Sequence, residues 1–170
     1  LGFLLSCIGV GSFLAALYLA ARKSVVGLGK GVTISAFLLG ISLMILSYID
    51  TYWIAAFICL PAGFAIISTV ASINTLLQTL SDEDKRGRVM GYLAMTFTGI
   101  APVGSMFLGS LEKQTGLPAI ILISGVSCAL GGIIFEYYRP LVRKHARQVY
   151  IRKGIIQEIA TGIDAAEEQI

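Results

Sequence analysis

Charge is scarce in this sequence. Only 14% of its 170 residues are charged, whereas 56% are hydrophobic. A typical soluble domain carries about 25% charged residues. So little charge excludes an ordinary soluble domain and makes a lipid bilayer the expected partner. The formal net charge of +3 is modest, and we expect no nucleic-acid partner.

Cysteine and histidine are also rare. Cys7, Cys59 and Cys128 each stand alone inside an apolar run, and His145 is the single histidine, among basic residues near the C-terminus. This spacing excludes a disulfide framework and fits no common metal-ligand pattern. No nucleophile with a base and no carboxylate pair stands out either. We therefore expect neither a cofactor nor an enzyme.

Long apolar runs, in contrast, fill most of the chain. About 20 apolar residues, at a rise of 1.5 Å each, cross a hydrocarbon core of about 30 Å. The sequence therefore predicts an all-α membrane protein with five transmembrane helices, followed by a tail at residues 139–170. The tail is either solvated or forms a short amphipathic helix. The predicted spans are about 1–21, 31–49, 52–80, 89–111 and 117–138.

The number of spans and the first residues suggest a larger parent protein. One cleaved signal peptide cannot account for five apolar runs. The chain also begins with "LGF", already inside a span, and the number of spans is odd. We expect the sequence to be a fragment of a longer protein.

Basic residues lie almost entirely on one side of the predicted spans. All but one of the 13 lysines and arginines fall in residues 22–30, in residues 81–88 or in the tail. Only Lys113 lies in a loop on the opposite side. Because lysine and arginine are retained on the cytoplasmic side of a membrane, we expect both basic loops and the C-terminus to be cytoplasmic.

Polar side chains within the spans concentrate on the third predicted helix. Asn74 and Gln78 are four residues apart and share one helix face. Two interpretations remain open: hydrogen bonding between helices of a bundle, or a wet cavity that a polar solute crosses. An adjoining stripe consists of Ser68, Ser72, Thr75 and Thr79.

Small residues at four-residue spacing predict close contact between helices. The fourth span also combines Pro102 with several glycines, among them Gly99, Gly104 and Gly109. A mid-span proline bends a helix, and glycines let a neighbouring backbone approach. We predict an interface that moves, with a static kinked helix as the alternative. The predicted contact seams are Ser12–Ala16–Ala20, Ala101–Ser105–Gly109 and Ser124–Cys128–Gly132.

The longest informative stretch is "NTLLQTLSDEDKRGRVMGYLAMTFTGIAPVGSMFLGSLEKQTG", residues 74–116. It resembles the tenth and eleventh helices, with their cytoplasmic loop, of the major facilitator superfamily. It is most similar to the bacterial branch that includes enterobactin exporters and multidrug exporters. The tail "VYIRKGIIQEIATG", residues 149–162, also resembles that branch.

The resemblance implies a fold and a function. The five helices would be the eighth to the twelfth of twelve, which is most of the C-terminal six-helix half, and the N-terminal half would be a partner. The protein would be a multi-pass exporter of the bacterial plasma membrane, driven by protons. Its small hydrophobic or amphipathic substrate, such as a siderophore or a drug, would cross as the two halves rock.

The resemblance also assigns roles to individual residues. Asn74 and Gln78 become candidates for the substrate pathway or the cytoplasmic gate, and residues 99–104 become part of a hinge between the halves, with Gly109 on the same helix. The charged segment "SDEDKRGRVMGY" then has two interpretations. It is either a loop that its basic residues retain in the cytoplasm, with acids at a helix start, or a gate that pairs with the other half. The gate candidates are Asp82, Arg86 and Arg88.

One segment departs from the family pattern. The loop between the eighth and ninth helices often carries an aspartate followed by basic residues, but here it reads "ARKSVVGLGKG", without an acid. An acid–arginine latch within this loop is therefore not expected. The alternative functional class is a non-transporting membrane scaffold or an enzyme subunit. Six further spans upstream, one with an acidic residue, would favour the transporter.

Overall fold

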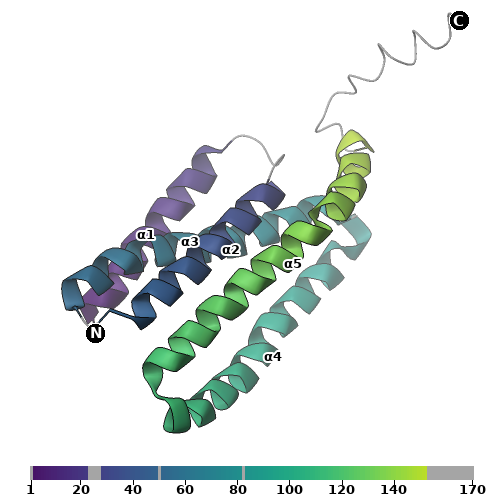
Figure 1. The fold of residues 1–170 in the computed structure, drawn as a ribbon. Coiled ribbons are helices and arrows are strands. Elements are labelled where there is room, and N and C mark those ends of the chain that lie inside the picture. Colours follow the sequence, from purple (N-terminus) through teal and green to yellow (C-terminus); the bar gives the residue numbers. More distant parts are fainter. Residues whose placement is uncertain (1, 23–27, 50, 82, 153–170) are drawn as a thin grey trace, which may run out of the picture.

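The structure is a computed structural model that describes residues 2–22, 28–49, 51–81 and 83–152. The described residues contain five α-helices and no strand, and each helix is long and apolar enough to cross a membrane. A spanning chain must satisfy its backbone hydrogen bonds internally, and a helix does so. The predicted all-α membrane fold is thus confirmed (Figure 1). The helices are α1 (Gly2–Ala21), α2 (Leu28–Ser47), α3 (Tyr52–Leu80), α4 (Glu83–Thr115) and α5 (Leu117–Arg152).

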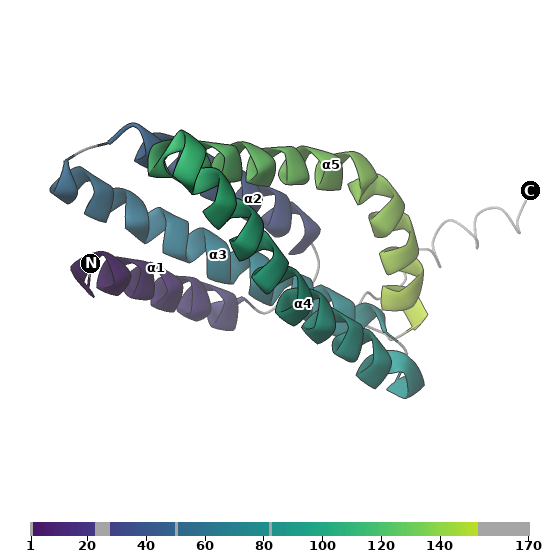
Figure 2. The same cartoon turned by 90° about the horizontal axis from the view of Figure 1, so that it is seen from below.

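α4 and α5 extend furthest beyond the spans predicted for them. α4 begins at Glu83, so the charges expected in a loop lie in its first two turns. Its 33 residues give a length of about 50 Å, well beyond a core of about 30 Å. α5 continues past residue 138 and through Pro140, so the first part of the predicted tail is helical. Figure 2 shows α5 curving at this end, as expected where a proline removes a backbone hydrogen bond.

α1 packs along α3 through a seam of glycine and alanine. A Cβ atom on Gly11 would collide with the carbonyl oxygen of Leu60, and one on Gly63 with that of Ile8. Ala15 is completely buried in the same seam. The predicted seam of α1 was wrong by one position: Ala16 and Ala20 are exposed, while Gly11 and Ala15 face α3. Ser12 lies beside the seam, and its hydroxyl donates to the carbonyl oxygen of Gly63 at 3.2 Å.

α2 lies between α3 and α5 and approaches α5 at a second glycine pair. A Cβ atom on Gly40 would lie 2.9 Å from the carbonyl oxygen of Gly125, and the reverse distance is also 2.9 Å. Gly132 packs against Ala36 and Phe37. The seam predicted on α5 is therefore correct at Gly132, but its closest approach is at Gly125.

α4 stands apart from the other helices. It runs beside α5 and crosses α3 at its beginning, but it is far from α1 (Figures 1 and 2). None of the residues in its apolar span is buried within the described chain. A tight turn at Gly116 joins it to α5, with a φ of 80° and an N–H that donates to the Glu112 carbonyl at 2.9 Å. Such a left-handed residue commonly closes a helix, and glycine adopts it without a steric penalty.

Candidate functional site

Three polar side chains form a hydrogen-bonded chain between the end of α3 and the start of α4. The Gln78 amide nitrogen donates to Asn74 Oδ1 at 3.3 Å, and Arg86 Nη2 donates to Gln78 Oε1 at 2.9 Å. Asn74 and Gln78 are half-buried, whereas Arg86 is exposed. The two substrate-pathway candidates and one gate candidate from the sequence are thus brought together. We call these three residues the amide–arginine chain.

Local geometry explains why these residues meet. Asn74 and Gln78 are one helical turn apart, and the two helices are separated only by residues 81–82. Ser81 ends α3: both its backbone N–H and its hydroxyl donate to the carbonyl oxygen of Leu77, at 3.0 and 2.6 Å. The first turns of α4 therefore start beside the last turns of α3. Arg86, in the first turn of α4, can then reach back to Gln78.

The arginine polarises and orients the amide of Gln78. A charged donor makes a stronger hydrogen bond than a neutral one, although exposure of Arg86 reduces the net gain to about 1 kcal/mol. Both ends of the Gln78 amide are used, which holds its plane in one orientation. The polar face of α3 therefore presents an amide of fixed direction next to a guanidinium group.

The other two gate candidates do not take part in the amide–arginine chain. Arg88 is exposed and has no hydrogen bond or ion pair with the described residues. Asp82 lies outside the described residues. Of the three gate candidates, Arg86 alone is tied to the polar face of α3 in this part of the structure.

The glycines and the proline in the middle of α4 contact no other described element. A Cβ atom on Gly99, Gly104 or Gly109 would find nothing within 4 Å. Pro102, inside the helix, is also exposed. These residues were predicted to belong to an interface between the halves of a transporter, and nothing in the described chain packs against them. The Ala101–Ser105–Gly109 seam likewise has no partner here.

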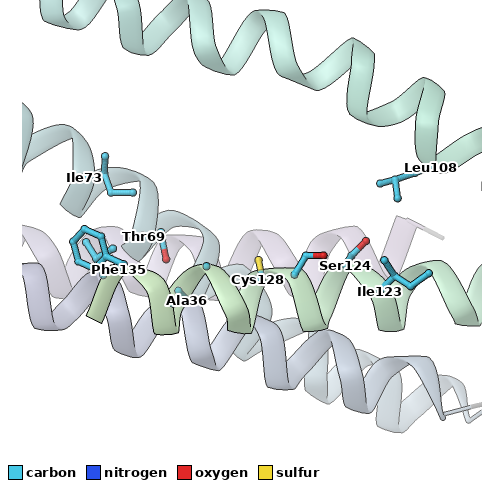
Figure 3. Close-up of a pocket in the computed structure, with 12 residues that line it drawn as sticks. Ala36, Thr69, Ile73, Leu108, Ile123, Ser124, Cys128 and Phe135 are labelled. Carbon is cyan, nitrogen blue, oxygen red and sulfur yellow. The ribbon is translucent and has the colours of Figure 1, made fainter. Parts of the chain in front are cut away.

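A cavity of about 590 Å³ opens between α2, α3, α4 and α5. Figure 3 shows Thr69 and Ile73 of α3 on one side, Leu108 of α4 opposite, and Cys128 and Phe135 on α5. The lining is apolar apart from a few hydroxyl groups. Sequence reasoning missed this cavity because its walls come from four separate helices. The Ser124–Cys128–Gly132 stripe was the available signal, and it was interpreted as a seam.

A second polar cluster also escaped sequence reasoning. The Thr33 hydroxyl of α2 lies 2.9 Å from Glu136 Oε2 of α5, and Arg139 Nη1 lies 2.8 Å from Glu136 Oε1. The same hydroxyl is 3.3 Å from the carbonyl oxygen of Gly29, so the shorter contact to Glu136 dominates. Thr33 is buried. The cluster therefore joins α2 to α5 near the predicted cytoplasmic ends of both helices.

Replacing Thr33 with valine should weaken this junction without changing its shape. Valine has the same branching but cannot donate to Glu136, and a net hydrogen bond is worth about 1 kcal/mol. We expect the midpoint of thermal unfolding of the purified protein in detergent to fall by about 2–4 °C. Thr96→Val is the control, since Thr96 is exposed and donates only to Tyr92 of its own helix. Equal shifts for both variants would contradict the expectation.

Comparison with known proteins places the chain in a family. A sequence model of the family described as transmembrane secretion effector matches residues 1–158. The multidrug efflux pump Tap of Mycolicibacterium fortuitum is 23% identical over 144 residues, which are 85% of this chain and 35% of that protein. The chain thus spans about a third of the length of this relative. No solved structure matches. Since the family match covers nearly the whole chain, the chain belongs to the transmembrane secretion effectors, an exporter-like family of the major facilitator superfamily.

Proposed function

We propose that this chain supplies helices eight to twelve of a secondary transporter that exports a small hydrophobic or amphipathic molecule. The family match and the distant likeness to a multidrug efflux pump support an exporter. Drugs and siderophores are the proposed substrate classes. In this proposal two six-helix halves rock about a central site, so that the site opens alternately to each side of the membrane.

The observation that carries the proposal is the amide–arginine chain. It ties the polar face of α3, which would line the pathway, to Arg86 in the first turns of α4. A movement of α4 relative to α3 must stretch the contact between Arg86 and Gln78. The amide–arginine chain is therefore suited to couple the conformation of the pathway to that of α4, as a cytoplasmic gate requires.

The unpacked surface of α4 supports a second contact with the N-terminal half. Its glycines leave space for another backbone to approach, and small residues favour close helix packing in membranes. We assign Gly99, Pro102, Gly104 and Gly109 to the moving interface between the halves. The C-terminus is proposed to lie in the cytoplasm of a bacterial cell, on the side of the basic residues.

Coupling to protons is proposed to depend on a carboxylate elsewhere in the transporter. Among the described acidic side chains, Asp84 and Glu112 lie at the ends of a candidate span, and Glu136 lies in the last third of the span Leu117–Val142. Glu136 is in addition engaged by Thr33 and Arg139. Acidic residues that carry protons across a membrane usually face the interior of the bundle within the span.

Transport by the complete protein in liposomes tests the proposal. The full-length transporter that contains this chain would be reconstituted into liposomes. The liposomes would be loaded with a fluorescent amphipathic cation and given a proton gradient that is acidic outside. We expect directional movement of the dye that stops when a protonophore collapses the gradient. Dye binding without movement would favour the scaffold alternative, and movement that ignores the gradient would overturn proton coupling.

A further inference from the structure

We propose that the start of α2, at the predicted cytoplasmic side, binds the headgroup of an anionic phospholipid through Arg22 and Lys30. The inference goes beyond the proposed export function, because it needs the membrane fold and no exported substrate. Arg22 directly follows α1, and Lys30 lies in the first turn of α2. In Figures 1 and 2 the end of α1, the start of α2 and the last part of α5 lie at the same end of the bundle.

Both cations lie at the depth of the lipid headgroups. The candidate span of α1 ends at Ala21, and that of α2 begins at Leu28. Each of these spans has 20 residues, which at 1.5 Å per residue cover about 30 Å, the thickness of the hydrocarbon core. Arg22 and Lys30 therefore lie where the two spans meet the headgroup region. Basic residues between helices at this depth are a common means of binding lipid headgroups.

Arg22 lies against the beginning of α2 because a glycine occupies position 31. A Cβ atom on Gly31 would lie 3.8 Å from Nη1 of Arg22, so the missing side chain lets the guanidinium group approach the α2 backbone. Lys30 is the preceding residue, and consecutive Cα atoms are about 3.8 Å apart. The two cationic groups are thus close enough to contact one phosphate. The guanidinium fork suits a pair of phosphate oxygens, and the ammonium group adds a compact charge.

The acid near this site is already neutralised. Arg139 Nη1 lies 2.8 Å from Oε1 of Glu136, and the Thr33 hydroxyl lies 2.9 Å from its Oε2. Lys30 is exposed and forms no ion pair with a described residue. Because Glu136 and Arg139 cancel each other, the charges of Arg22 and Lys30 remain to attract an anion.

The face of α2 that carries Lys30 continues into the membrane as an exposed apolar row. Ile34, Ile41 and Ile45 are all exposed. Spacings of four, seven and four residues place them on one helix face with Lys30, and the residues of α2 that line the cavity lie on the opposite face. A lipid whose phosphate contacts Lys30 would lay its acyl chains along this row. A soluble anion would gain nothing from the row, so a lipid is the proposed ligand.

The net charge of the headgroup decides which lipid fits. Phosphatidylethanolamine carries an ammonium group beside its phosphate, and two protein cations would repel that group. Phosphatidylglycerol has the same phosphate without the ammonium group and is therefore the expected ligand. Each basic residue near a membrane surface adds about fivefold to the binding of an anionic lipid, so Arg22 and Lys30 together should give a preference of about 20-fold.

Photo-labelling of the full-length transporter in lipid nanodiscs tests the site. Phosphatidylglycerol and phosphatidylethanolamine, each with a diazirine group in one acyl chain, would be supplied in equal amounts. After illumination, peptide mass spectrometry counts the adducts on residues 34–45. We expect phosphatidylglycerol adducts on this row to exceed phosphatidylethanolamine adducts about 20-fold.

Charge variants assign this preference to the two cations. Arg22→Gln combined with Lys30→Gln should bring the ratio of adducts close to one. The matched control is Lys85→Gln combined with Lys113→Gln, which removes two exposed cations elsewhere and should leave the ratio within about twofold of the unmodified protein. Arg22→Lys combined with Lys30→Arg keeps both charges and should keep the preference, which separates recognition of the lipid from damage to the fold.

Three outcomes would overturn the site. A ratio near one in the unmodified protein would mean that the row contacts bulk lipid only. An equal loss in both glutamine double variants would mean that overall charge, and not this site, attracts the lipid. Loss of the preference on addition of inorganic phosphate, at an ionic strength matched with chloride, would show a site for a soluble anion. Export is no part of the readout, so this test and that of the proposed function fail independently.

Discussion

Replacing Gly11 with alanine is expected to separate α1 from α3 and to give the largest loss of stability of any single methyl addition in α1. The new Cβ atom would collide with the carbonyl oxygen of Leu60, which is backbone and cannot turn aside. Overpacking of this kind costs about 3 kcal/mol. The midpoint of thermal unfolding of the purified protein in detergent should therefore fall by about 6–12 °C.

The matched control is Gly9→Ala, two residues earlier on the same helix. A Cβ atom on Gly9 finds nothing within 4 Å, and alanine is the better helix former by up to about 1 kcal/mol. Gly9→Ala should thus leave the midpoint unchanged or raise it. If the two variants shift the midpoint equally, helix propensity governs both positions and the close packing of α1 on α3 is not the cause.

Replacing Gln78 with leucine is expected to lower export about tenfold in the full-length transporter, while the amount of protein in the membrane stays the same. Leucine can neither accept from Arg86 nor donate to Asn74, so the amide–arginine chain is broken at both contacts. A tenfold change corresponds to about 1.4 kcal/mol, which is the size of two weakened hydrogen bonds. Initial rates of dye export from cells, normalised to transporter abundance, measure the effect.

A double-mutant cycle separates this effect from general damage to α3. Arg86→Gln should lower export in the same direction, and the double variant should be no worse than Gln78→Leu alone, because both remove the same contact. Thr75→Val, an exposed change on the same helix, should keep at least half of the activity. Additive losses in the double variant would mean that Gln78 and Arg86 act independently.

Features that depend on neighbouring residues were predictable from the sequence. Five membrane-length helices follow from apolar runs, which are local signals. Asn74 and Gln78 were expected to share a face, and the hydrogen bond between them confirms it. Helix ends were less predictable. The span was predicted to begin at about residue 89, although the acids before it were also interpreted as a helix start. α4 begins at Glu83 and includes the charges from Asp84 to Arg88, of which lysine and arginine are good helix formers.

Contacts between distant residues could not be predicted, because a sequence shows the faces of a helix but not what covers them. The residues Thr33 and Glu136 are 103 positions apart, and nothing near either one signals the other. The seam of α1 was displaced by one residue for a related reason. Both Gly11 and Ser12 begin a row of small residues, and the partner backbone on α3 decides which row is used.

The placement of α4 has a mechanical consequence. The helix is fixed at both ends, by the two residues after α3 and by the turn at Gly116, but little of its surface between them is packed. Few packed side chains therefore oppose a turn of this helix about its own axis. Because Arg86 lies in the first turn of α4 and donates to Gln78, such a turn would act directly on the polar end of α3.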